Sequence, residues 1–94
     1  MNDRITLLRL AITTWGENAQ IDMCLEEMSE LAKALLKWRR YGGDVFMSDK
    51  AVLEEIADVQ IMLDQMRILF GSTDTYEAVK LERLEKRLNR EDIT

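Results

Sequence analysis

Residues 52–63 read VLEEIADVQIML, and residues 24–35 read CLEEMSELAKAL. Each stretch is largely apolar and contains two adjacent acids. A third acid follows three residues after the second of these two. Successive residues of an α-helix are about 100° apart, so acids three residues apart lie side by side on one face. The stretch 24–35 places Glu27 beside Glu30 in this way, and the stretch 52–63 places Glu55 beside Asp58.

These acids do not have the positions of ordinary surface carboxylates. With Glu55 as the reference, Val59 and Met62 fall within about 40° of it, so Glu55 belongs to the apolar arc of its helix. Glu27 falls beside Leu31 in the same way. A buried carboxylate without a partner costs several kcal/mol, and four that face one another require a cation. The alternatives are ion pairs and protonated core acids.

The type of ligand indicates which cation to expect. Carboxylate oxygens without His or Cys favour Mg²⁺, with Mn²⁺ as the alternative, and argue against zinc. The sequence contains no histidine, which also removes the usual general base and any Ser-His or Cys-His catalytic pair.

The remaining sequence predicts a single all-α domain, residues 1–94, with a four-helix bundle-like fold. The chain has no proline and only four glycines, which favours long uninterrupted helices. We expect Gly42-Gly43 to end the second helix before a loop over 42–48, Ser48 or Asp49 to cap the third, and Asp74 to cap the fourth with Glu77. The expected helices span residues 3–15, 19–41, 50–70 and 74–89.

Composition excludes several classes of protein. The net charge of −5, from 18 acidic and 13 basic residues, disfavours a nucleic-acid polymer as partner, because such binding needs a basic surface. No run approaches the roughly 20 apolar residues that span a bilayer, and the N-terminus lacks the features of a signal peptide. Cys24 is the single cysteine, so no internal disulfide can form. These features predict a cytoplasmic protein without membrane association.

With these motifs in place, the chain resembles the MazG-like all-α nucleoside triphosphate pyrophosphohydrolases. The resemblance rests on ExxE followed by ExxD, on Trp15-Gly16 and Gln20 before the first motif, and on the tail KLERLEKRL at 80–88. It implies Mg²⁺-dependent hydrolysis of an NTP or dNTP between the α- and β-phosphates, which releases a nucleoside monophosphate and pyrophosphate. The implied metal ligands are Glu27, Glu30, Glu55 and Asp58, and Glu27 or Glu30 is also the candidate catalytic residue that orients the water.

Candidates for contacts with the substrate are weaker. Trp15, Gln20 and Trp38 are candidates for binding the base, although core packing is the favoured alternative for both tryptophans. Several basic residues can meet phosphates, although solvation or ion pairing is the favoured alternative for them. These residues are Lys33, Lys37, Arg39, Arg40 and Lys50. The resemblance further implies a basic residue near the phosphates in the last helix, for which Lys80 and Arg83 are the candidates.

The apolar character of residues 50–70 also predicts association. A helix that is apolar on several sides needs neighbours on those sides, and a 94-residue chain supplies few, so we expect a homodimer or homotetramer. The stripe of Leu81, Leu84 and Leu88 is a further packing or dimer surface. The main alternative function is therefore a non-enzymatic helical interaction module with the same fold. In the implied reaction the four acids act on the metal and the phosphates, so they do not indicate which nucleobase the substrate carries.

Overall fold

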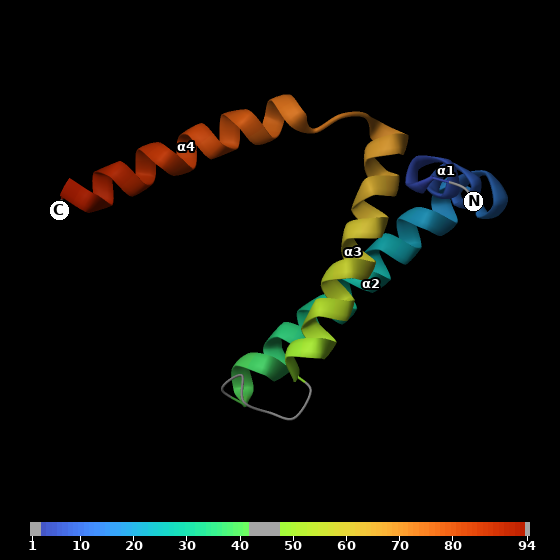
Figure 1. Ribbon diagram of the computed structural model, residues 1–94, viewed down its shortest axis with the longest axis horizontal. Coiled ribbons are helices and arrows are strands. Elements are labelled where there is room, and N and C mark those ends of the chain that lie inside the picture. The colour runs from blue at the N-terminus through green and yellow to red at the C-terminus, as the bar shows by residue number, and fades with distance from the viewer. Residues whose placement is uncertain (1–2, 42–47, 94) are drawn as a thin grey trace.

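The computed structural model describes the backbone of residues 3–41 and 48–93 and the side chains of residues 3–41 and 49–90. These residues form four α-helices and no strand, which confirms the all-α prediction. No helix within the described ranges combines the length and the apolarity needed to cross a membrane. The helices are α1 (Arg4–Trp15), α2 (Glu17–Arg40), α3 (Ser48–Phe70) and α4 (Asp74–Ile93) (Figure 1).

Local chemistry explains where the first two helices begin. The carboxylate of Asp3 accepts a hydrogen bond of 2.8 Å from the backbone N–H of Thr6 and so caps α1. This bond holds the pKa of Asp3 below its usual value. Gly16 alone separates α1 from α2, because its φ of 92° and ψ of 158° belong to a region that is essentially restricted to glycine. The expected interruption over residues 16–18 is therefore a single residue.

The other helix ends differ slightly from the predictions. Ser48 and Asp49 are the first two residues of α3, so the helix begins at the expected cap instead of after it. Likewise, Asp74 is already the first residue of α4, and the preceding Thr73 hydroxyl donates a hydrogen bond to the carboxylate of Glu77. The expected stop at Gly42-Gly43 lies outside the described residues.

The packed part of the molecule is a hairpin of α2 and α3, which run antiparallel, with α1 lying against both at one end (Figure 1). Arg4 ties α1 to α3, since its Nε and a terminal guanidinium nitrogen donate to Asp64 at 2.9 and 2.6 Å. Among the described residues no side chain falls below 2% exposure. The buried side chains are Leu8, Gln20, Cys24, Val59, Met62 and Gln65.

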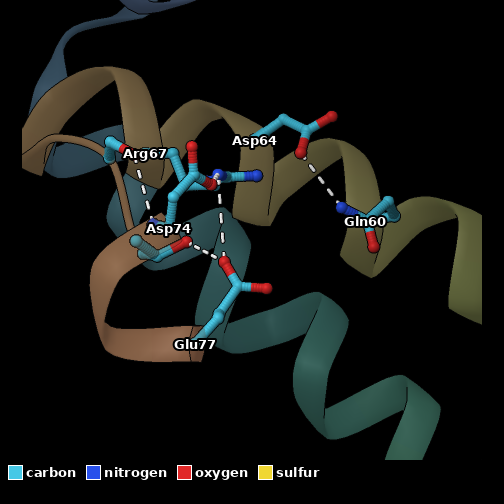
Figure 2. A network of polar contacts seen from close by, with 7 residues as sticks. Gln60, Asp64, Arg67, Asp74 and Glu77 are labelled. Carbon is cyan, nitrogen blue, oxygen red and sulfur yellow. Dashed lines mark hydrogen bonds and ion pairs between the residues drawn. The ribbon is translucent and has the colours of Figure 1, made fainter. Parts of the chain in front are cut away.

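The fourth helix does not join this packing. In the described part of the chain, α4 does not pack along any of the other three helices; it meets α3 only near the turn and extends away from the end of α3 (Figure 1). Gly71, with φ of 118°, lies at the turn, and Arg67 of α3 pairs with Asp74 at 2.7 Å and with Glu77 at 3.9 Å (Figure 2). The neighbours expected on several sides of the apolar third helix are not all supplied within one chain, because many apolar side chains of α3 remain exposed.

Candidate metal centre

Three of the four predicted carboxylates meet between α2 and α3. One carboxylate oxygen from each of Glu27, Glu55 and Asp58 lies within 4.8 Å of the others. Glu27 and Glu55 are half-buried, whereas Asp58 is exposed at the rim. We call these three side chains the acid cluster. Its members come from the middle of the hairpin, where the packing positions of the two helices face each other.

The fourth predicted carboxylate lies outside this group. Glu30 is one turn further along α2, its side chain is 46% exposed, and it accepts a contact of 3.4 Å from Lys33. Glu30 comes three residues after Glu27, so the two side chains are neighbours on the surface of α2. The structure therefore separates a convergent set of three acids from a neighbouring fourth.

The acid cluster is electrostatically unbalanced. Desolvation raises the pKa of Glu27 from its ordinary value of 4.5, and the charges of Asp58, Glu55, Glu26 and Glu30 raise it further. The buried Oε2 atom of Glu55 has no hydrogen-bond partner among the described residues. No Lys or Arg of the described part forms an ion pair with Glu27, Glu55 or Asp58. A cation would supply both the missing partner and the missing charge.

The donors of the acid cluster suit a hard divalent cation. All of them are carboxylate oxygens on two helices, which is the ligand chemistry of Mg²⁺ and Mn²⁺. Mg²⁺ commonly binds through a few carboxylates and keeps its remaining positions for water or substrate phosphates. Three converging acids with one side open to solvent therefore fit a site of this type.

The two tryptophans have different surroundings. Trp15 is 66% exposed at the end of α1, so it is not packed in the core of a single chain. Trp38 is 39% exposed, and its indole N–H donates a hydrogen bond to the carboxylate of Asp49 on α3. This bond joins the two helices at the loop end of the hairpin. The ring of Trp38 is thus both anchored and partly accessible.

The remaining candidates for substrate contacts are scattered. Gln20 is buried at 5% exposure near the start of α2. Lys33 contacts Glu30, and Lys50 lies exposed in the first turn of α3. Lys80 and Arg83 are on α4, so within one chain the structure does not bring them to the acid cluster.

The sequence analysis did not predict the roles of two polar residues of the hairpin, Asp49 and Gln65. Asp49 was expected only as a helix cap, yet it holds the indole of Trp38. Trp38 and Asp49 are 11 residues apart, on either side of a stretch that contains Gly42-Gly43, and this spacing is the sequence signal for the contact. Gln65 is buried at 4% exposure, and its Oε1 has no partner among the described residues. No sequence signal distinguishes it from an exposed glutamine.

Comparison with protein-family models, with curated proteins and with solved structures finds no match to this chain. The resemblance to MazG-like proteins therefore rests on the motifs alone.

Proposed function

We propose that this protein is a Mg²⁺-dependent nucleotide pyrophosphohydrolase of the MazG-like type. The observation that carries the proposal is the convergence of three carboxylates within 4.8 Å, one of which has a buried oxygen without a partner in the described residues. A bound cation would compensate the charge of this cluster and supply the partner that the buried oxygen lacks. The substrate would be an NTP or dNTP, cleaved between its α- and β-phosphates.

In this proposal Glu27, Glu55 and Asp58 hold the metal, and Glu30 joins them after leaving Lys33. A carboxylate-bound divalent cation supplies phosphate-charge neutralisation and an activated water in hydrolases of this class. The chain's own contribution is to hold the acids on two rigid helices, so that little rearrangement is needed at the moment of reaction. Glu27 or Glu30, both on α2, is the acid proposed to orient the water.

The proposal also assigns contacts with the base and the phosphates. Trp38 offers an anchored and partly exposed ring for stacking, whereas Trp15 is exposed on a different helix. Lys33 and Lys50 are available from the hairpin itself. Lys80, Arg83 and other basic residues of α4 would reach phosphates only from a second subunit or after α4 has moved. The proposed assembly is a homodimer or homotetramer.

The test is an incubation of the protein with a panel of NTPs and dNTPs and Mg²⁺, with separate detection of pyrophosphate and orthophosphate. We expect pyrophosphate and the nucleoside monophosphate from at least one nucleotide. Glu55→Gln should abolish the activity. Glu54→Gln is the matched control, because Glu54 is the exposed neighbour that lies outside the acid cluster. Release of orthophosphate alone, or equal activity in both variants, would contradict the proposal.

The alternative is a non-enzymatic interaction module, and exposed apolar side chains on α2, α3 and α4 are the observation that favours it. The two functions predict different results in a binding experiment. A site for metal and nucleotide requires that Mg²⁺ bind in the millimolar range or tighter and that binding be lost in Glu55→Gln. A pure interaction module has no such requirement.

A further inference from the structure

A cleft lies between α1 and α3, close to the turn that leads into α4. Its volume is about 510 Å³. Arginines from two helices line it, together with apolar side chains and one hydroxyl. We call this space the arginine cleft; its lining includes Arg4, Ile5 and Arg9 of α1, Arg67 and Ile68 of α3, and Ser72 of the turn.

The arginine cleft is separate from the acid cluster. Asp64, which also lines the cleft, comes nine residues after Glu55 on α3. Nine residues of an α-helix correspond to a rotation of about 180° and a rise of about 14 Å. Asp64 and Glu55 therefore point to opposite sides of α3, and a ligand in the cleft leaves the acid cluster free.

Carboxylates hold two of the three arginines in place. Nε and a terminal nitrogen of Arg4 both donate to Oδ2 of Asp64, at 2.9 and 2.6 Å. Oδ1 of Asp64 accepts a hydrogen bond of 3.0 Å from Gln60, so both oxygens of this carboxylate have partners (Figure 2). The hydrogen bond from Arg4 holds the pKa of Asp64 below its usual value, which keeps this anchor charged. Arg67 in turn donates to Asp74 at 2.7 Å.

Enough donors remain in the cleft for an additional anion. A guanidinium carries five N–H groups, and these hydrogen bonds use two of Arg4 and one of Arg67. Arg9 is exposed and forms no ion pair with any residue of the described ranges. The Ser72 hydroxyl accepts a hydrogen bond of 3.2 Å from the backbone N–H of Asp74, so its own proton is available for donation. Donors therefore converge from α1, from α3 and from the turn.

Charge determines which ligands the cleft attracts. Its charged lining consists of three arginines and Asp64, a balance of +2 in a chain whose net charge is −5. Asp74 and Glu77 contact Arg67 from the side of α4 and offset part of this charge. The remaining positive charge attracts a dianion more strongly than a monoanion. A phosphate monoester carries about −1.5 to −2 at neutral pH, and its oxygens match the planar donors of a guanidinium.

Apolar side chains of the cleft indicate an organic group on that phosphate. Ile5, Leu8 and Ile68 line the cleft beside the arginines. Ile5 is 53% exposed, so an apolar group that covers it removes apolar surface from water. The volume of about 510 Å³ lies within the range of about 300–1,000 Å³ that small-molecule sites occupy, and it is larger than a phosphate ion alone needs.

We propose that the arginine cleft binds a phosphate monoester whose organic part is apolar. Arg4, Arg9 and Arg67 surround the phosphate, and Ile5 and Ile68 contact the organic group. Inorganic phosphate shares the chemistry of the anion, so it is the competing ligand. The inference does not depend on the proposed hydrolase activity, because the cleft shares no residue with the acid cluster.

The first test is calorimetric titration of the metal-free protein with phenyl phosphate, inorganic phosphate and benzoate at constant ionic strength. We expect phenyl phosphate to bind several-fold more tightly than inorganic phosphate, and benzoate, a monoanion with the same ring, to bind most weakly. The affinity for phenyl phosphate should fall as the pH is lowered through about 6, the second pKa of a phosphate monoester. Equal affinity for the two phosphates would overturn the organic part of the proposal and identify inorganic phosphate as the ligand. No binding of phenyl phosphate, or binding equal to that of benzoate, would overturn the whole.

A matched pair of variants locates the site. Arg9→Gln removes a guanidinium without an ion pair in the described part of the chain, and glutamine is a good helix former, so α1 should stay folded. We expect this substitution to raise the dissociation constant of phenyl phosphate roughly fivefold. Arg87→Gln is the control, because Arg87 is an exposed arginine of α4 outside the cleft. An equal effect of both substitutions, or none of Arg9→Gln, would contradict the proposal.

A second measurement needs no variant. In a two-dimensional amide NMR spectrum of the wild-type protein, phenyl phosphate should shift the backbone signals of Arg9 and Ser72 most strongly. A smaller cleft of about 270 Å³ at the end of α2, lined by Lys33, Lys37 and Arg40, offers the competing basic surface. The largest shifts at that smaller cleft would show that the anion binds there, and the proposal would be wrong.

Discussion

Neutralising Glu55 should stabilise the metal-free protein and remove its response to Mg²⁺. The magnitude follows from the geometry of the acid cluster. Two unit charges 4.8 Å apart repel by about 0.9 kcal/mol in water and by about 3.5 kcal/mol at an effective dielectric constant of 20. Asp58 is exposed, so the lower value applies better here. Glu55 faces two such neighbours, Glu27 and Asp58.

We therefore expect Glu55→Gln to raise the free energy of unfolding by about 1–2 kcal/mol in the presence of a chelator. For a domain of this size that gain corresponds to a rise of roughly 4–16 °C in melting temperature. The wild-type protein should instead gain about 2.7 kcal/mol when Mg²⁺ is present at a hundred times its dissociation constant. Glu55→Gln should lose most of that gain.

The assay is thermal unfolding followed by circular dichroism, with and without Mg²⁺, for the wild type, Glu55→Gln and Glu54→Gln. Glu54→Gln should change the free energy of unfolding by less than about 0.5 kcal/mol and keep the response to Mg²⁺, because Glu54 is exposed outside the cluster. A lower melting temperature of Glu55→Gln in chelator would refute the repulsion argument. An equal Mg²⁺ response in Glu55→Gln and the wild type would refute the metal site.

Three further predictions concern the rest of the molecule. Because the pKa of Glu27 is raised in the folded state, protonation of Glu27 favours folding below its ordinary pKa of 4.5, and this contribution is lost as the pH rises through the raised pKa. The metal-free protein should therefore lose stability over that pH range, as measured by melting temperatures in a pH series. Addition of Mg²⁺ or the substitution Glu27→Gln should reduce this dependence on pH. Gly16→Ala should cost about 1–3 kcal/mol in a denaturant titration, since alanine is strained at a φ of 92°, whereas Thr14→Ala should have a small effect. Arg4→Met should lower the free energy of unfolding by about 0.5–1 kcal/mol, because the ion pair with Asp64 is lost. This difference should shrink as the salt concentration rises. An unchanged free energy of unfolding would mean that the pair contributes nothing to the docking of α1.

Many features of this protein depend on residues that are close together in the sequence, so they can be predicted from the sequence. The helical period, the absence of proline and the positions of Gly16 and Gly71 predict four helices, with ends within a few residues of those observed. The side-by-side placement of Glu27 with Glu30, and of Glu55 with Asp58, is likewise a property of a single helix. Capping, propensity and the i,i+3 relation act over a few residues only, so they can be evaluated without knowledge of the fold.

Which side chains of one helix meet those of another could be learned only from the tertiary structure. The sequence places four acids on apolar arcs, but only the packing of α2 against α3 separates the convergent Glu27, Glu55 and Asp58 from Glu30. It also shows that Trp38 is held by Asp49 and that α4 leaves the bundle. The apolar residues of α3 predict burial of that helix, whereas in one chain a whole side of it is exposed. An apolar pattern states how much surface must be covered, and only the arrangement of the helices decides what covers it.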